Sequence, residues 1–224
     1  MATIFDDYLY LAHRIDRGMA KRFCPDLSGT VLDVGCGRRP YHSLLANAAR
    51  VIGMDRNPAL RPDVIGSVLH IPVAGGAVNA VLCNEVLEHG PEPGFALAEM
   101  RRVLAPGGLV YATVPQSWGL HYEPHDYYRF TKYGISHLLE EGGFSVVRIE
   151  QMGGIFSFTA VRLIDFLVLV VLFPLLDRLG LRRGKYRLSA LLVLPLSLAG
   201  WGISALLDRF DRTDAYGWAV LARK

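Results

Sequence analysis

The sequence predicts an α/β fold, a doubly wound and mostly parallel sheet of seven strands with an apolar helical hairpin inserted between strands six and seven. Short apolar runs alternate with helix-like stretches over residues 30–151, which is typical of a parallel sheet covered by helices on both faces. Residues 152–213 interrupt this alternation with two long apolar stretches. Because the strand-like segment 216–222 then resumes the pattern, residues 152–213 are predicted to be an insertion.

The composition excludes several classes of protein. Apolar residues make up 51% of the 224 residues and charged residues 20%, so the chain is not disordered. A net charge of +3 is too small to indicate a nucleic-acid partner, and none is expected. Cys24, Cys36 and Cys83 form no CxxC pair, which favours a reducing compartment without structural zinc. Asp6 and Asp7 come early and no apolar run follows a basic start, so we expect no secretory signal.

The chain begins with an amphipathic pattern. Apolar residues recur at helical spacing over 4–23, and Pro25 ends the pattern. The apolar positions are Ile4, Tyr8, Leu11, Ile15 and Met19. We therefore divide the chain into three parts. They are an N-terminal helix in 1–29, a sheet domain in 30–151 and 214–224, and the apolar hairpin in 152–213.

Within the sheet domain the order of elements follows from apolar runs and turn residues. Strands are predicted over Thr30–Val34, Val51–Met54, Asp63–Ile65, Ala80–Cys83, Leu109–Val114, Phe144–Ile149 and Tyr216–Ala222. Helices are predicted over about 40–49, Pro93–Leu104 and Thr131–Glu141. Pro106-Gly107-Gly108 forms the turn before the fifth strand, and Gly142-Gly143 ends the third helix.

The first strand runs into a glycine-rich turn, in the sequence Val31-Leu-Asp-Val-Gly-Cys-Gly37. Glycines let a backbone approach a ligand closely. A dinucleotide-binding turn would have a third glycine where this chain has Pro40, so a pyrophosphate ligand is not expected. Asp33, just before the turn, opposes phosphate and suits a cationic ligand.

The segment 31–37 resembles motif I of class I S-adenosylmethionine-dependent methyltransferases of the methyltransferase type 11 kind. Three further segments resemble that family in the same order, namely Val51–Asp55, Val81–His89 and Met100–Gly108. The resemblance covers about 30–151 and resumes at 216–222. It implies a Rossmann-like sheet with an antiparallel last strand, and S-adenosylmethionine as the cofactor.

The same resemblance implies a set of cofactor-binding residues. Asp55 would accept hydrogen bonds from both ribose hydroxyls. This chain has Gly66-Ser67 where the family often has Gly-Asp, and Val78-Asn79 where it favours Phe-Asp, so a weaker contact to adenine is expected. The implied cofactor-binding residues are Asp33, Gly35, Cys36, Gly37, Asp55, Arg56, Ser67, Val68 and Asn84.

After the fifth strand, residues 115–131 are rich in titratable and aromatic side chains and are predicted to form a lid over the substrate. We expect His125 to be a general base and Asp126 to orient its ring or the loop, with His121 as the second candidate base. Alternatively, His125 and Asp126 cap the helix that starts near Thr131, while Tyr127, Tyr128 and Phe130 pack the lid.

Two further groups of titratable residues lie near this edge. Glu88 and His89 follow the fourth strand and could face the acceptor or simply shape the turn. The spacing of His121, Glu123, His125 and Asp126 matches no zinc pattern, so no metal is expected.

The insertion contains two apolar stretches, Phe166–Leu176 and Leu188–Leu207. Both ends of the insertion must return to one sheet, so two membrane spans would place the basic link Arg178–Arg187 on the far side of the membrane. Basic residues are favoured on the cytoplasmic side, which opposes this arrangement. A hairpin of helices broken at Pro174 and Pro195 and lying in one leaflet is favoured. A buried helical subdomain or dimer interface, and two true spans, are the alternatives.

The favoured function is methyl transfer to a membrane-associated acceptor, such as the hydroxyl of a lipid-linked sugar. The enzyme would be cytoplasmic, held at the inner face of the cytoplasmic membrane through residues 155–212. One alternative is methylation of a soluble small molecule, with the hairpin as the interface of a homodimer. Another is a non-catalytic cofactor-binding scaffold at the membrane. The acceptor and the methylated atom stay open.

Overall fold

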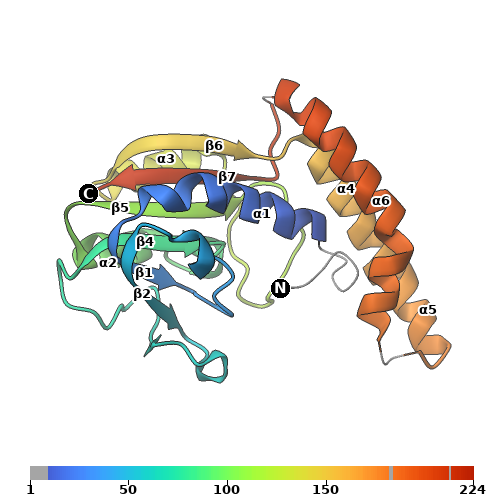
Figure 1. Ribbon diagram of the computed structural model, residues 1–224, viewed down its shortest axis with the longest axis horizontal. Coiled ribbons are helices and arrows are strands. Elements are labelled where there is room, and N and C mark those ends of the chain that lie inside the picture. Colours follow the sequence, from blue (N-terminus) through green and yellow to red (C-terminus); the bar gives the residue numbers. More distant parts are fainter. Residues whose placement is uncertain (1–9, 182–183, 212) are drawn as a thin grey trace. The chain divides into compact units, whose positions relative to one another are not determined.

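The computed structural model describes residues 10–181, 184–211 and 213–224 (Figure 1). Within them the chain divides into two compact units. The sheet unit comprises Met19–Glu150 and Gly217–Lys224, and the hairpin unit comprises Gln151–Tyr216 with the described residues up to Gly18.

The sheet has seven strands in the order β3-β2-β1-β4-β5-β7-β6. Strands β1 to β5 pair in parallel, and β7 pairs antiparallel with β5. The predicted fold class and the antiparallel last strand are thus confirmed. The strands are β1 Gly29–Val34, β2 Ala48–Asp55, β3 Val64–Ile65, β4 Val78–Asn84, β5 Leu104–Pro115, β6 Ser145–Met152 and β7 Gly217–Arg223.

The central strands are buried on both faces, as expected of the middle of a parallel sheet. Leu32 and Leu82 are 0% exposed on β1 and β4, and the first six residues of β7 are all buried. Phe23 stacks on Tyr111 of β5 with ring centroids 4.9 Å apart. The core of the sheet unit is therefore made of large apolar and aromatic side chains.

Helices α1 Tyr10–Phe23, α2 Pro93–Val103 and α3 Lys132–Glu141 occur where helices were predicted. The hydroxyl of Thr131 accepts the Gly134 N–H at 3.1 Å and caps α3, and Gly143, with φ +78°, follows its end. In α1, Leu11 is buried, whereas the predicted positions Ile4 and Tyr8 lie outside the described residues.

The helix predicted over about 40–49 is wrong. One 3₁₀ turn occupies His42–Leu44, and β2 already begins at Ala48, where it pairs with Gly29 of β1. Ala48, which the helix would have included, pairs with β1 instead, so the helix cannot extend over this range. The remaining 3₁₀ turns are Cys24–Asp26, Pro58–Leu60, Leu87–His89 and Asp208–Phe210.

The insertion forms two helical arms that lie side by side (Figure 1). The first arm joins α4 Ile155–Asp165, a π-helical stretch Phe166–Leu172 and α5 Phe173–Arg178, and the second is α6 Lys185–Leu207. Pro174 lies just after the π-helical stretch, and its missing N–H and its ring disfavour regular α-helical hydrogen bonding in the turn before it. The break expected at Pro195 is absent, because α6 runs through it. Arg182 and Arg183 of the basic link lie outside the described residues.

Candidate functional site

The candidate site lies where the parallel strands end. In the sheet, β1 is flanked by β2 on one side and β4 on the other, so the strand order reverses between β1 and β4. Ligands of open α/β sheets bind outside the carboxyl ends of the strands at such a switch point. The cofactor-binding residues predicted from the sequence lie at or just beyond the carboxyl ends of β1, β2, β3 and β4.

The glycine loop after β1 requires glycine at two positions. Gly35 and Gly37 have φ of +71° and +51°, in the left-handed region that side chains disfavour. A Cβ on Gly35 would also lie 2.5 Å from Cγ2 of Val86. Cys36 between them is buried, which raises the pKa of its thiol to about 11, so it is not a thiolate nucleophile at neutral pH. The loop therefore presents backbone rather than reactive side chains.

Asp55, the last residue of β2, holds this loop in place. Its Oδ2 accepts the Gly37 N–H at 3.0 Å, and its Oδ1 accepts the Asn57 N–H at 2.8 Å. A carboxylate oxygen has two lone pairs, so each oxygen can accept one more hydrogen bond. Arg56, the next residue, is exposed.

Asp33 near the end of β1 is 2% exposed and bonds to a residue that the sequence analysis did not single out. His42 Nε2 lies 2.9 Å from Asp33 Oδ2. Burial raises the pKa of Asp33, and the hydrogen bond from His42 opposes that rise. His42 was missed because the predicted helix over 40–49 would have aimed it differently. The only feature of the sequence that could have indicated the Asp33–His42 pair is a histidine soon after the glycine loop.

Asn84 ends β4 at the same edge. Its Nδ2 donates to the hydroxyl of Tyr41 at 3.1 Å, whereas its buried Oδ1 has no hydrogen-bond partner among the described residues. A buried acceptor of this kind is stabilised by a donor such as an ammonium group. Asn84 is thus a polar group suited to a cationic ligand.

Ser67 and Val68 lie beyond β3. The Ser67 hydroxyl accepts the Leu69 N–H at 3.2 Å, and Ser67 forms an isolated antiparallel bridge with His70. Val68 is partly buried and lies near Gly90 after β4. Ser67 is exposed, and its hydroxyl can still donate a hydrogen bond while it stabilises this turn.

In the lid, Asp126 contacts His121 and Arg129. Both of its oxygens bond to Arg129, at 2.7 and 2.8 Å, and Oδ2 also accepts the backbone N–H of His121 at 3.0 Å. The Arg129 guanidinium holds the pKa of Asp126 well below its usual range. His121 is half-buried, which lowers its pKa. Asp126 therefore orients the loop and His121.

His125, the first candidate base, is exposed. Its Nδ1 lies 3.1 Å from the Tyr127 hydroxyl, and its carbonyl oxygen lies 2.6 Å from Nδ1 of His89. Neither His125 nor Asp126 caps α3, because Thr131 does. The lid thus presents the His125 ring to solvent while its backbone is tied to the turn after β4.

The residues at this edge fit S-adenosylmethionine by their chemistry. A sulfonium and an ammonium group suit the carboxylate of Asp33 and the acceptor oxygen of Asn84. The spare lone pairs of Asp55 suit vicinal hydroxyls, and the left-handed Gly37 carries no side chain to block a ligand. The remaining predicted residue on the adenine side, Ser67, is a weaker acceptor than a carboxylate.

Comparison with known proteins finds similarity to methyltransferases over part of the chain. Residues 32–112 match the family model described as "Methyltransferase domain". An uncharacterized methyltransferase of Mycobacterium leprae is 34% identical over 108 residues, covering 42% of this chain and 40% of that protein. The ubiquinone biosynthesis O-methyltransferase of Sodalis glossinidius is 32% identical over 108 residues, covering 39% of this chain and 43% of that protein. Such matches span less than half of each relative's length.

Solved structures resemble the chain over more of its length. A SAM-dependent methyltransferase from Archaeoglobus fulgidus superposes with a TM-score of 0.59 at 16% identity, over 97% of this chain and 100% of that chain. The 1,6-didemethyltoxoflavin-N1-methyltransferase of Burkholderia thailandensis, solved with S-adenosylhomocysteine, gives 0.58 at 16% identity, over 96% of this chain and 80% of that chain. At these identities the likeness shows the fold.

Proposed function

We propose that this chain, whose residues 32–112 match the family model of a methyltransferase domain, is an S-adenosylmethionine-dependent methyltransferase. One observation carries the proposal. The glycine loop 35–37 follows β1, and Asp33 and Asp55 lie at the carboxyl ends of β1 and β2, at the same edge of the sheet as the switch point. S-adenosylmethionine, when bound, supplies an electrophilic methyl group on its sulfonium.

The residues of the chain then have separate tasks. Asp55 would bind the ribose hydroxyls, and Asp33 and Asn84 would bind the ammonium end of the cofactor. The lid excludes water and places the acceptor in line with the methyl group, which is the main requirement of this chemistry. His125 takes the proton from an acceptor hydroxyl, an effect worth typically 10²–10⁴-fold in rate.

The first experiment titrates the protein with S-adenosylmethionine by calorimetry. Asp55→Asn should weaken binding at least about 10-fold, because it removes the charge that the ribose hydroxyls donate to. Glu140→Gln, on the exposed side of α3, is the control and should bind as the wild type does. Equal affinity in all three proteins would contradict the proposed cofactor site.

The second experiment follows label from methyl-labelled S-adenosylmethionine in an extract of the source organism. His125→Ala should lower transfer about 10²-fold or more while cofactor affinity stays unchanged. His137→Gln, an exposed substitution on α3, should transfer label as the wild type does. Lost cofactor affinity in His125→Ala would instead assign His125 a structural role.

We further propose that the acceptor is membrane-associated and that the hairpin unit docks the enzyme on one leaflet. The supporting observation is that burial along α6 is the reverse of that in a helix of a water-soluble core. Its buried residues are small or β-branched, whereas its exposed face is rich in Leu and aromatic side chains. The buried set is Ser189, Ala190, Val193, Ser197, Gly200 and Ser204, and the exposed set includes Leu191, Leu192, Leu198, Trp201, Ile203 and Leu206. Small residues between helices and large apolar ones outside are typical of helix pairs in lipid.

Length and charge support the same surface. Ile155–Arg178 and Lys185–Phe210 are both long and apolar enough to cross a membrane, and only 28% of each apolar window is buried. Between them, Arg178 is exposed and Lys185 pairs with Asp177 at 3.2 Å. Basic residues beside an apolar hairpin favour anionic head groups. Exposed apolar area of this size would otherwise need a second protein surface.

Flotation with phosphatidylcholine vesicles, with and without phosphatidylglycerol, tests the docking. The double substitution Leu192→Lys with Leu206→Lys should abolish flotation, because both side chains are more than half exposed on α6. Phe95→Lys, on an even more exposed side chain of α2 in the sheet unit, should float as the wild type does. If the double variant still floats, the proposal is wrong. If it instead converts a dimer to a monomer in light scattering, the hairpin is a dimer interface.

The acceptor itself is tested by phase partition of the labelled product. Label in the organic phase would support a lipid-linked acceptor. Label in the aqueous phase would still support methyltransferase activity, but on a soluble acceptor, and the hairpin would then be a packing or dimer surface. No label above that of Asp55→Asn, with cofactor binding intact, would favour the non-catalytic scaffold.

A further inference from the structure

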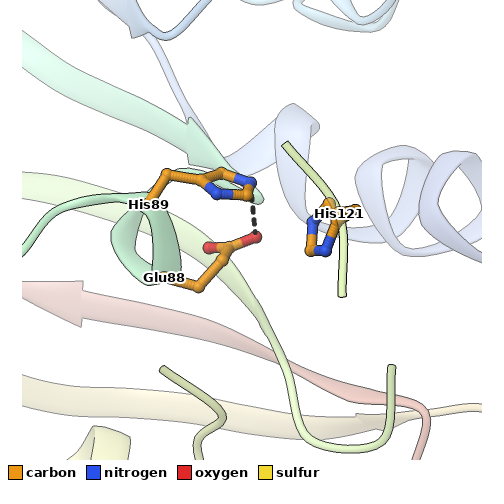
Figure 2. Close-up of side chains that lie close together, drawn as sticks. All are labelled: Glu88, His89 and His121. Atoms are coloured by element: carbon orange, nitrogen blue, oxygen red, sulfur yellow. Dashed lines mark ion pairs between the residues drawn. The ribbon is translucent and has the colours of Figure 1, made fainter. Parts of the chain in front are cut away.

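A second group of side chains meets beside the predicted cofactor residues. Glu88 and His89 belong to the 3₁₀ turn Leu87–His89 after β4, and His121 belongs to the lid after β5. One ligand atom from each of the three lies within 4.8 Å of those of the other two. Figure 2 shows the carboxylate and the two rings gathered around one point. The His89 and His121 rings lie 4.7 Å apart, inclined at 74°.

The hydrogen bonds of both histidines fix which nitrogen carries the proton. His89 Nδ1 lies 2.6 Å from the carbonyl oxygen of His125, which can only accept, so Nδ1 carries the hydrogen. His121 Nδ1 lies 3.2 Å from the carbonyl oxygen of Gly119 and 3.3 Å from Oδ2 of Asp126, so the same holds. In each ring Nε2 is left to bind a cation. Metal-ligating histidines almost always donate their other N–H to a carbonyl or carboxylate in this way.

Glu88 supplies the negative charge of the group. Its side chain is 0% exposed, and Oε1 lies 3.6 Å from Nε2 of His89, which is too long for a strong hydrogen bond. With the hydrogen on Nδ1, a neutral His89 turns a lone pair toward this carboxylate. Two lone pairs at that separation are stabilised by a positive centre between them, either a proton, on His89 or on the carboxyl of Glu88, or a metal ion.

We propose that Glu88, His89 and His121 bind one divalent transition-metal ion, with Zn²⁺ the best match. Two imidazole nitrogens and one carboxylate form a known set of three protein ligands in zinc sites that keep a further position open. Zinc bonds of about 2.0–2.1 Å place tetrahedral ligands about 3.3 Å apart. The His89–Glu88 pair is already near that spacing at 3.6 Å, and all three ligand atoms lie within 4.8 Å of one another, so the ligands would move closer together on binding.

The charges around the group permit a cation. Arg129 is a nearby cation, but its guanidinium is already bound by both Asp126 oxygens. That hydrogen bonding is the main cause that raises the pKa of Arg129, and the charge of Glu88 adds a smaller part. Three protein ligands would leave a further position open on the ion, which an oxygen of the acceptor could complete. In that arrangement His121 is a ligand, which leaves His125 as the base. Metal binding itself does not depend on methyl transfer.

The three ligands come from two segments of the chain, and spacing within one segment does not reveal such a group. Of the four lid residues weighed as ligands, only His121 belongs to this group, and the other two members come from the turn after β4. The strands β4 and β5 are paired neighbours, so the segments that follow them meet at one edge. Only that pairing brings the three ligands together.

The test uses the full chain without a histidine tag, stripped by a chelator and titrated with Zn²⁺ by calorimetry. Bound zinc is counted by elemental analysis, and Co²⁺ absorption reports nitrogen and oxygen ligands. We expect one ion per chain. Glu88→Gln and His121→Gln should each weaken zinc binding at least about 100-fold. His137→Gln, on the exposed side of α3, is the matched control and should bind as the wild type does.

Two results would overturn the proposal. One is a wild-type protein that binds no zinc, which would leave a proton shared by His89 and Glu88 in place of the ion. The other is equal binding by all four proteins, which would place the zinc elsewhere. If Glu88→Gln does not fold, as judged by circular dichroism, the half-exposed His121→Gln decides the question alone.

Discussion

In the sheet unit the buried side chains are large, and on α6 of the hairpin unit they are small. Leu32, Leu82 and Tyr111 are 0% exposed in the sheet, whereas Ser189, Gly200 and other small residues form the buried face of α6. Burying large apolar surface stabilises a fold in water. A helix that buries its small residues and exposes its large ones gains little stability from the hydrophobic effect, which is why we propose a lipid surface for the hairpin unit.

The largest expected difference between the units comes from truncating leucines. Leu82→Ala leaves a cavity in β4 and should lower the free energy of unfolding by about 2–5 kcal/mol. Leu192→Ala removes a side chain that is 55% exposed on α6 and should change it by less than about 0.5 kcal/mol in mild detergent. Denaturant titration followed by circular dichroism measures both. Similar losses would show that Leu192 is buried in solution, as in a dimer.

The next largest difference between the units is in helix capping. The start of α3 is capped by the adjacent Thr131, whereas the start of α4 is capped by Asp208, which follows α6. The Asp208 carboxylate accepts the N–H groups of Phe156 and Ser157, at 3.0 and 3.2 Å, and also bonds to the Ser157 hydroxyl. Asp208→Ala should therefore cost about 2–3 kcal/mol, more than the roughly 1 kcal/mol expected for Thr131→Ala. The same unfolding titrations compare them, and the reverse order would contradict the capping of α4 by Asp208.

The packing of the two arms provides a matched pair of glycines within α6. A Cβ at Gly200 would lie 2.7 Å from the Cβ of Ala160, whereas a Cβ at Gly202 would meet nothing within 4 Å. Gly200→Ala should lower the free energy of unfolding by about 1–2 kcal/mol through overpacking. Gly202→Ala should raise it by about 0.4–1 kcal/mol, because alanine favours the helix. Equal effects would mean that the arms are not packed through Gly200.

The smallest expected difference is in the dependence on pH. In the sheet unit, Arg102 and the Ile71 N–H lower the pKa of Glu99 to about 2, so its stabilising effect is lost as pH falls from about 5 toward 2. In the hairpin unit, burial raises the pKa of Asp16 to about 7, and stability falls as pH rises from about 4 through 7. At pH 8, Glu99→Gln should destabilise and Asp16→Asn should stabilise, each on the order of 1 kcal/mol.

Unfolding titrations at pH 4 and pH 8 check these opposite signs. At pH 4 the Asp16→Asn variant should match the wild type, because the wild-type carboxyl is then protonated in the folded state. A gain in stability that is the same at both pH values would show that burial of the charge is not its cause.

Much of the sheet unit could be predicted from the pattern of residues. The glycine loop, the caps of α3 and the strands of the sheet follow from local preferences and apolar runs. The helix expected over 40–49 failed because Ala48 pairs with Gly29, a contact between distant segments. The Asp33–His42 pair was missed for the same reason, since a 3₁₀ turn rather than a helix positions His42.

The sequence by itself determined the local conformations, because left-handed glycines, capping hydroxyls and apolar periodicity act on neighbouring residues. It also determined that residues 152–213 are too apolar for an ordinary surface. The tertiary structure alone decided which distant groups meet, as in the capping of α4 by Asp208 and the gathering of Glu88, His89 and His121. Such contacts depend on strand pairing and helix packing, which spacing along the chain does not encode.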